Sequence, residues 1–90
     1  MPKYILETSS KFEKQYKKLS LDDKSKTKTI INKLLSGEKL EAKYKDHLLS
    51  GNFKNYRECH IKPDLLLIYK IDDKVSILSC IRVGSHSNLF

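Results

Sequence analysis

The side chains best suited to proton transfer and phosphate binding lie in the second half of this 90-residue chain. All three histidines are there, His47, His60 and His86, and so are both arginines, Arg57 and Arg82. Histidine can act as a base or an acid near neutral pH. The guanidinium group of arginine is always charged and fits the oxygens of a phosphate. This clustering indicates a site that acts on phosphate esters.

Cleavage of RNA without a metal ion needs a base for the 2′-hydroxyl, a cation for the phosphate and an acid for the departing 5′-oxygen. His47, His60, Asp64 and His86 are the candidates for proton transfer, and Arg82 is the candidate cation. His86 is the strongest single candidate, because it lies in a short tail with Gly and Ser neighbours and no apolar period explains it. An ordinary structural role at a strand end stays open for His60, Asp64 and Arg82.

Metal binding and thiol chemistry are less favoured by the sequence. His60 and Asp64 are separated by a proline, and the histidines do not match a zinc spacing. Cys59 and Cys80 each lie in an apolar run without a C-x-x-C spacing, which is typical of reduced, buried side chains. A disulfide between neighbouring strands stays open. We therefore predict no metal site and no cofactor.

Composition limits the size of the core and the kind of partner. Ninety residues make one domain, spanning 1–90. The net charge of +7, from 18 Lys and Arg against 11 Asp and Glu, favours a polyanionic partner such as RNA, DNA or an acidic protein. A merely soluble, lysine-rich surface is the alternative. No apolar run approaches the roughly 20 residues that span a bilayer, so we expect a cytoplasmic protein without a membrane partner.

Two helices are predicted in the first half of the chain. Ser10 and Glu13 have the spacing of a capping box, which predicts the start of the first helix. The second helix is predicted to begin at Ser20 and to end at Gly37, and the short link between the two makes them an antiparallel hairpin. Their many lysines are interpreted first as a solvated face, with a docking surface for the ribosome or a partner protein as the alternative.

Four strands are predicted, at residues 3–7, 53–61, 64–71 and 74–82. Residues 65–69 are apolar on both faces, so their strand should be central, with the helices on one side and another part of the chain on the other. Asp72 and Asp73 are predicted to form a two-residue turn. The fold class is therefore α+β: an N-terminal strand and an antiparallel helical hairpin packed on a small antiparallel sheet, in the order β-α-α-β-β-β.

A series of short motifs runs through residues 44–90. They are Tyr44-Lys45-Asp46-His47, Leu49-x-Gly51, Tyr56-Arg57-Glu58-Cys59-His60, Pro63-Asp64, Leu67-Ile68-Tyr69-Lys70 and Arg82-x-Gly84-x-His86-x-x-Leu89-Phe90. In this order and spacing they resemble the YafQ-type branch of the RelE/ParE toxin superfamily, whereas the first half is similar only in pattern. The resemblance implies the toxin of a type II toxin–antitoxin pair. It also implies an mRNA interferase, an endoribonuclease that cuts mRNA in the ribosomal A site without a metal.

The resemblance also assigns roles to the candidate residues. It implies that His86 is the general acid and that Arg82 clamps the phosphate. His47, His60 and Asp64 match the other proton-handling and positioning groups of the family, and the resemblance does not choose the general base among them.

Further residues are expected to bind the RNA. Phe90 matches the terminal aromatic residue with which the family orients its substrate, and Lys45, Lys54 and Arg57 are predicted as additional contacts. Leu65 stands where some relatives have a tryptophan, so base stacking at that position is not expected to carry over.

The resemblance implies partners as well. A free toxin would harm its host, so we expect a cognate antitoxin with an acidic, partly disordered segment that orders on the basic surface. The complex is expected to bind operator DNA through the antitoxin. Two other classes of function stay open: a non-catalytic, ParE-like inhibitor, which would not need the histidines, and a basic nucleic-acid-binding module without activity.

Overall fold

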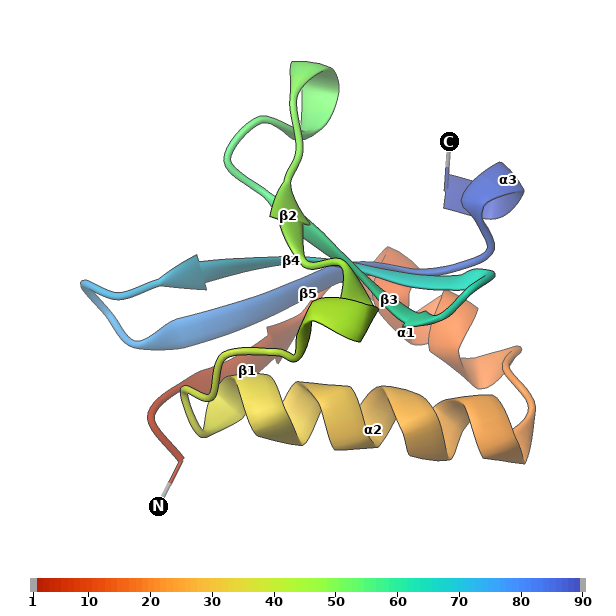
Figure 1. Cartoon of the computed structure of the whole chain (residues 1–90), viewed down its shortest axis with the longest axis horizontal. Coiled ribbons are helices and arrows are strands. Elements are labelled where there is room, and N and C mark those ends of the chain that lie inside the picture. The colour runs from red at the N-terminus through yellow and green to blue at the C-terminus, as the bar shows by residue number, and fades with distance from the viewer. Residues whose placement is uncertain (1, 90) are drawn as a thin grey trace.

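A computed structural model describes residues 2–89. In these residues a sheet of five strands, in the order β1-β5-β4-β3-β2, lies against two helices (Figure 1). The elements are β1 (Ile5–Thr8), α1 (Ser10–Lys17), α2 (Leu21–Leu35), η1 (Ala42–Tyr44), β2 (His47–Leu48), η2 (Gly51–Phe53), β3 (Arg57–Lys62), β4 (Leu65–Asp72), β5 (Ile77–Gly84) and α3 (His86–Leu89). The predicted α+β class is confirmed.

The first helix begins one position earlier than its capping-box pattern predicts. Ser9, not Ser10, is the N-cap of α1, and its Oγ accepts a hydrogen bond from Phe12 N at 3.0 Å. The same hydroxyl donates to the carbonyl of Ile81 in β5 at 2.7 Å. A tertiary contact that local spacing cannot reveal therefore favours Ser9 as the cap and ties α1 to the sheet.

The second helix has the ends that its sequence predicts. Ser20 caps α2, because its Oγ accepts from Asp23 N at 3.1 Å. Gly37 follows the helix with φ of 84°, the left-handed conformation that favours glycine after a helix. A Cβ at Gly37 would also lie 2.8 Å from Cδ of Lys3, so the position is restricted by packing as well as by conformation.

The sheet is antiparallel from β3 to β5, as predicted, and β2 extends it by one more antiparallel pair. β1, whose pairing was not predicted, joins the sheet as a parallel edge strand. Ile5 lies opposite Ile77 in the β1–β5 pair. The chain passes through α1 and α2 and the rest of the sheet before it reaches β5, and a parallel pair requires such a long connection. Three pairings are thus antiparallel and one is parallel.

Several strand limits differ from the prediction. The turn after β4 is longer than Asp72-Asp73, since Asp72 pairs with Ile77 and Ser76 has φ of 56° within the turn. The last strand therefore begins at 77, not at 74. The strand predicted to begin at 53 begins instead at 57, because Phe53 ends the short helix η2. The short β2 and the helix α3 were not predicted.

The central strand β4 is buried on both faces, as its apolar run predicts. Leu67 and Tyr69 belong to the core beneath α1 and α2, whereas Leu66 and Ile68 belong to a second cluster with Leu89. Figure 1 shows β2, η2 and α3 on the side of the sheet away from α2. We call this side the outer face.

The two cysteines are free and buried in the helix-side core, in agreement with the sequence. Burial raises the pKa of the Cys80 thiol to about 12, and it also raises the pKa of Cys59. Both thiols therefore stay protonated and act as small apolar groups. None of the helices in residues 2–89 combines the length and apolar character that crossing a bilayer requires.

Candidate functional site

A row of side chains crosses the outer face of the sheet. His47 lies opposite Glu58, Glu58 opposite Ile68, and Ile68 opposite Arg82. Directly opposite residues of neighbouring strands share a face, so these four side chains lie on one side of the sheet. Ile68 packs with Leu89 in the outer cluster, which identifies that side as the outer face. Two predicted site residues from opposite ends of the second half, His47 and Arg82, are thus brought into one row.

Arg82 reaches the outer face through an irregularity in β5. Ile68 lies opposite Arg82, but the next residue, Tyr69, lies opposite Cys80, so Ile81 is an extra residue in the strand. A bulge of this kind redirects side chains locally, and Ile81 packs in the outer cluster. The Nη1 of Arg82 donates to the carbonyl of Ile81 at 2.9 Å, which holds the half-buried guanidinium against its own strand.

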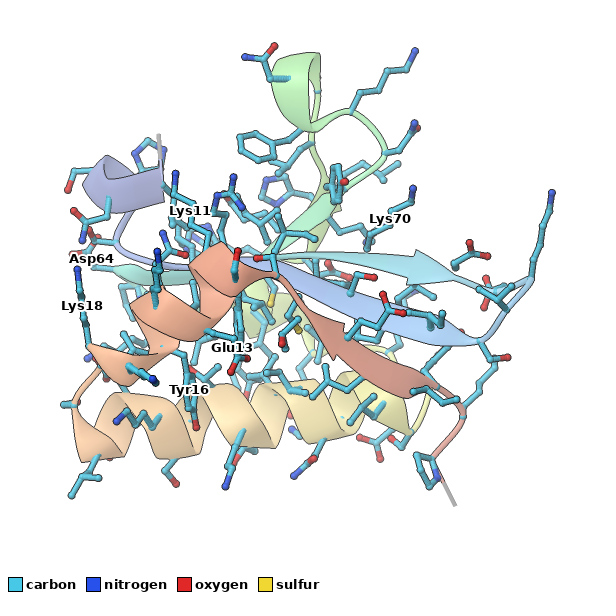
Figure 2. The ribbon with its side chains drawn as sticks, turned by 180° about the vertical axis from the view of Figure 1, so that it is seen from behind. Lys11, Glu13, Tyr16, Lys18, Asp64 and Lys70 are labelled. Atoms are coloured by element: carbon cyan, nitrogen blue, oxygen red, sulfur yellow. The ribbon has the colours of Figure 1, made fainter. Side chains whose placement is uncertain are left out.

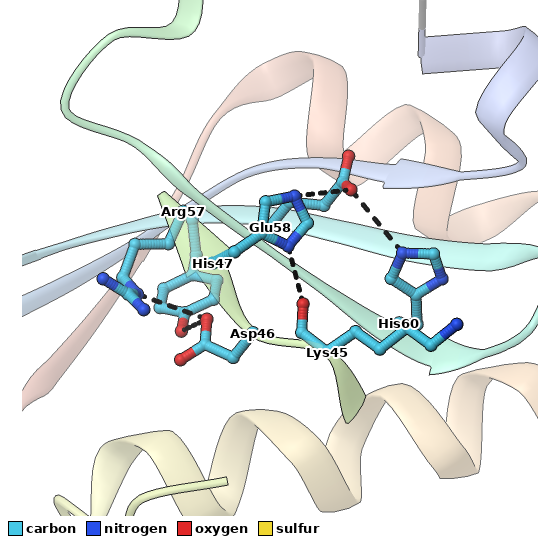
Figure 3. A network of polar contacts seen from close by, with 7 residues as sticks. Lys45, Asp46, His47, Arg57, Glu58 and His60 are labelled. Atoms are coloured by element: carbon cyan, nitrogen blue, oxygen red, sulfur yellow. Dashed lines mark hydrogen bonds and ion pairs between the residues drawn. The ribbon is translucent and has the colours of Figure 1, made fainter. Parts of the chain in front are cut away.

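Glu58 connects two of the three histidines (Figure 3). Its Oε1 lies 3.4 Å from His47 Nε2 and 3.7 Å from His60 Nε2. The Nδ1 of His47 lies 2.6 Å from the carbonyl of Lys45, and because a carbonyl only accepts, that nitrogen must carry a proton. Nε2 can then donate to Glu58 only when the ring is doubly protonated. The geometry therefore suits a His47 that takes up a proton beside the carboxylate.

Glu58 is a site residue that the sequence reasoning did not single out. The residue is only 5% exposed, and its Oε2 is buried without a hydrogen-bond partner among the residues described. A buried carboxylate oxygen without a partner is costly and calls for an explanation. The signal was present in the sequence, because Glu58 and His60 are two positions apart in a strand and so share a face.

A second row brings the C-terminal segment close to His60. His60 lies opposite Leu66, and Leu66 lies opposite Gly84. Strands are spaced by about 4.8 Å, so the Cα atoms of His60 and Gly84 are separated by roughly 10 Å. His86, which begins α3, follows Gly84 by two positions and is exposed. His86 therefore lies just beyond Gly84, at the β5 end of the row formed by His60, Leu66 and Gly84. This row is next to the one that contains Arg82.

Packing fixes the short helix α3 over the outer face. The Oγ and the carbonyl of Ser85 accept hydrogen bonds from Asn88 N at 3.3 Å and Leu89 N at 3.1 Å. Leu89 is 9% exposed and packs on the outer cluster. One turn before it, His86 is carried by the same helix. The tail is thus a positioned element, not an extended end.

Asp64 lies at the α3 end of the site. It is exposed in the turn between β3 and β4 and lines a pocket of about 430 Å³ with Gly84, Ser85 and Asn88. Figure 2 shows it beside α3. The structure thus places Asp64 with the C-terminal segment, whereas His47 and His60 share Glu58. The predicted role of Phe90 falls outside the described residues.

Arg57 lies on the opposite face from the other site candidates. It is paired with Tyr69, whose ring belongs to the helix-side core, and its Nε donates to Asp46 Oδ1 at 3.2 Å. Lys45 and Lys54 are exposed, in the segments next to β2 and η2. The structure therefore leaves the two lysines accessible to RNA and engages Arg57 with a carboxylate.

The Asp46 carboxylate holds the segment that carries His47. Besides Arg57, the hydroxyl of Tyr69 donates to Asp46 Oδ1 at 2.5 Å (Figure 3). Burial and the hydrogen bond to Asp46 raise the pKa of Tyr69 above its ordinary range, and the bond to Asp46 raises the pKa of Arg57. Since Asp46 directly precedes His47, these hydrogen bonds on the helix side of the sheet fix the position of the segment that carries the imidazole.

Residues 2–89 contain no ready set of metal ligands. No group of three or more His, Cys, Asp or Glu side chains in that range is arranged to hold a metal ion. The chemistry that the described residues supply is proton transfer by imidazole and carboxylate, together with charge stabilisation by guanidinium.

Comparisons with known proteins agree on one family. The family described as "Bacterial toxin of type II toxin-antitoxin system, YafQ" matches residues 4–90. The mRNA interferase toxin YafQ of Escherichia coli K12 is 44% identical over 69 residues, which cover 76% of this chain and 73% of the relative.

Solved structures match over nearly the whole chain. A crystal structure of the E. coli DinJ-YafQ toxin-antitoxin complex matches with a TM-score of 0.85 and 36% identity, covering 98% of both chains. A crystal structure of a metal-bound toxin from Helicobacter pylori matches with a TM-score of 0.84 and 41% identity, covering 97% of this chain and 99% of the other.

Proposed function

The chain belongs to the YafQ toxin family, and on this basis we propose that it is the toxin of a type II toxin–antitoxin system and an endoribonuclease that cuts mRNA. The observation that carries the proposal is the outer face of the sheet. That face joins the Glu58-linked imidazoles of His47 and His60 with the guanidinium of Arg82 and with α3, which begins at His86. The E. coli relative is named an mRNA interferase, and this set of groups suits that reaction.

The proposed reaction is an internal transfer at phosphorus. The 2′-oxygen forms a bond to the adjacent phosphorus as its proton passes to a base, and the bond from phosphorus to the 5′-oxygen breaks. His86 gives its proton to that 5′-oxygen, and Arg82 offsets the charge that builds on the phosphate oxygens. The products are a 2′,3′-cyclic phosphate and a 5′-hydroxyl. The base and the acid end in exchanged protonation states, which water restores, so the route needs no metal ion.

We assign the base to the histidine pair that shares Glu58. A carboxylate near an imidazole stabilises the ring when it takes a proton, and Glu58 is buried between His47 and His60. Asp64 lies beside α3, so we assign it a positioning role for the general acid. Glu58 is likewise a positioning residue, because it acts through the imidazoles.

The spacing of the strands leaves room for one phosphate between the histidines that contact Glu58 and the guanidinium of Arg82. Glu58 and Arg82 flank Ile68 on neighbouring strands, so their Cα atoms are separated by roughly 10 Å. Imidazole and guanidinium side chains extending from the two sides can therefore meet above Ile68. The exposed Lys45 and Lys54 are proposed to contact the flanking RNA backbone.

The proposed substrate is mRNA in the A site of the ribosome, which implies action in the cytoplasm. The net charge of +7 supports association with a ribonucleoprotein surface. The E. coli relative has been crystallised in complex with DinJ, and we propose a cognate acidic antitoxin for this chain too. That complex is proposed to bind operator DNA through the antitoxin.

The decisive experiment maps mRNA ends in a purified translation system supplied with wild-type protein or with His86→Ala. Wild-type protein, including protein dialysed against a chelator, should produce new 5′-hydroxyl ends, and His86→Ala should lose at least about a hundredfold in rate. Ser87→Ala, a neighbouring exposed change, is the matched control and should cut normally. Near-normal cleavage by folded His86→Ala would refute the assignment, and arrested translation with intact mRNA would favour a non-catalytic inhibitor.

A further inference from the structure

The outer face continues beyond the row that contains Arg82, on the side away from α3. Lys70 follows Ile68 by two positions along β4, and residues two apart in a strand share a face. The side chain of Lys70 is exposed and lies opposite Ser79 of β5. Figure 2 shows Lys70 on the side of the sheet that carries β2 and η2. A cation therefore lies roughly 7 Å along the strand from the place proposed for the phosphate, above Ile68.

The ring of Tyr56 holds the ammonium group of Lys70 in place. The Nζ of Lys70 lies 5.6 Å from the centroid of this ring, within the range of cation–π contacts. The ring is half-buried in the outer cluster and packs edge-to-face against Phe53, with the two centroids 6.3 Å apart. An ammonium group over a ring keeps N–H donors that can bind oxygen atoms. The contact thus restricts a long side chain in advance, so that less rotamer freedom is lost when it binds an anion.

Lys70 makes no ion pair with an acid in residues 2–89. Glu7 lies in the same row, opposite Ser79, but two strands separate it from Lys70, and the Cα atoms are roughly 10 Å apart. Asp72, two positions further along β4, accepts a hydrogen bond from Lys74 N at 3.0 Å. The charge of Lys70 is therefore available to an anion that another molecule supplies.

The proposed reaction gives the two sides of Ile68 different parts of the RNA. The departing 5′-oxygen takes its proton from His86, which lies beyond Gly84 and begins α3. The nucleotide on the 3′ side of the cut is therefore directed toward α3. The nucleotide that supplies the 2′-oxygen lies beside the histidine pair, so its own 5′-phosphate is directed the other way. That direction leads along β4 to Lys70 and Tyr56.

We propose that Lys70 binds the RNA phosphate immediately 5′ of the one that is cleaved, and that Tyr56 is the residue that positions Lys70. The inference rests on the proposed function, because that function places the cleaved phosphate above Ile68. Arg82 and Lys70 then bind successive phosphates of one strand, which runs along β4 with its 3′ end toward α3. This second contact fixes the direction of the strand, so that the 2′-hydroxyl of the correct nucleotide faces the histidine pair.

The test removes the charge of that phosphate and the charge of Lys70, separately and together. Ribosome-bound mRNA is synthesised with an uncharged methylphosphonate at the linkage 5′ of the mapped cut, or one linkage 3′ of the cut as the positional control. Wild type, Lys70→Gln, Tyr56→Leu and Lys74→Gln each cleave these mRNAs in single turnover. Lys74 is exposed in the turn after β4, and its variant is the matched control for the loss of one positive charge. A thermal melt verifies the fold of each variant.

With unmodified mRNA, Lys70→Gln should raise the toxin concentration that gives half the maximal rate by at least about fivefold, and Lys74→Gln by less than about twofold. The methylphosphonate 5′ of the cut should weaken wild type by a similar factor. It should leave Lys70→Gln nearly unaffected, because the partner charge is already missing.

Tyr56→Leu should also lose most of its sensitivity to the charge of the 5′ phosphate. A merely structural role of Tyr56 would reduce activity and leave that sensitivity intact. The methylphosphonate 3′ of the cut should affect all four proteins equally. If the 5′ methylphosphonate weakens wild type and Lys70→Gln by the same factor, the proposal is overturned.

A second arm needs no cleavage and so separates this inference from the proposed function. Fluorescence anisotropy measures the binding of the free toxin to a labelled oligouridylate with methylated 2′-hydroxyls, between about 50 and 200 mM salt. The slope of log affinity against log salt should fall by about 0.7 for Lys70→Gln and stay near the wild-type value for Lys74→Gln. Equal slopes for the two variants would refute the phosphate contact. If wild type cuts no mRNA but Lys70→Gln lowers the slope, the nuclease proposal fails and the phosphate site stands.

Discussion

Glu58→Gln is the sharpest test of the site, because it removes one charge and keeps the shape of the side chain. Glu58 Oε1 lies between the Nε2 atoms of His47 and His60, at 3.4 Å and 3.7 Å. If either imidazole takes the 2′-proton in the transition state, the carboxylate stabilises the new positive charge. The substitution should therefore slow the cleavage step without weakening substrate binding.

The size of the effect follows from distance and exposure. Two unit charges at this separation interact by about 5 kcal/mol at an effective dielectric constant of about 20 and by about 1 kcal/mol in water. The His47 side chain is 49% exposed, so the value lies near the lower end, at about 1–2 kcal/mol. This range corresponds to a rate loss of about 5- to 30-fold.

Single-turnover cleavage of ribosome-bound mRNA measures that loss, and the dependence of the rate on toxin concentration separates chemistry from binding. Glu13→Gln, on the exposed face of α1, is the control for loss of one negative charge. A thermal melt verifies the fold of each variant. If folded Glu58→Gln cuts within about twofold of the wild-type rate, Glu58 has no part in the reaction and the assignment of the histidine pair as base loses its support.

Three further predictions concern the frame around the site. Asp46→Ala leaves Arg57 and Tyr69 without their shared acceptor, so urea denaturation should show a free energy of unfolding lower by about 2 kcal/mol; an unchanged midpoint would contradict the positioning role. Leu89→Ala should release α3 and reduce cleavage more than it reduces stability, which comparison of the rate with the melting temperature tests. The pKa of Cys80, about 12 in the fold against an ordinary 9.0, means that the native state keeps a proton that the unfolded chain loses. The stabilisation from this proton should be complete below pH about 9, and the free energy of unfolding should fall by about 1.4 kcal/mol per pH unit above it. Urea titrations of Cys80→Ala across this range should show a smaller fall in the free energy of unfolding with pH.

Elements governed by local chemistry were predictable from the sequence. The Ser20 cap, the left-handed Gly37 and the apolar run of 65–69 each act within a few residues. Nothing distant competes with them, so the second helix and the central strand lie where the pattern predicts. The clustering of histidines and arginines in the second half of the chain predicted a common site. The structure places His47, His60 and Arg82 on the outer face, but Arg57 lies on the other face.

Features that depend on pairing between distant strands were not predictable. The hydroxyl of Ser9 reaches Ile81 across the fold, which shifts the first cap, and the extra residue Ile81 becomes visible only against the register of β4. For Glu58 the sequence shows only that it shares a strand face with His60; its second partner, His47, is brought to it by the pairing of β3 with β2, a strand that was not predicted.

The central strand also explains how opposite charges coexist on one face without cancelling each other. Ile68 separates Glu58 from Arg82 by a full strand on each side, roughly 10 Å between the outer Cα atoms. Within residues 2–89 Glu58 contacts only imidazoles at ion-pair distance, and Arg82 makes no ion pair with an acid. If Glu58 and Arg82 were adjacent, each would neutralise the other, and neither would serve a reacting phosphate. Because an apolar residue lies between them, the carboxylate contacts the histidines, and the guanidinium is available for the phosphate in the reaction that we propose.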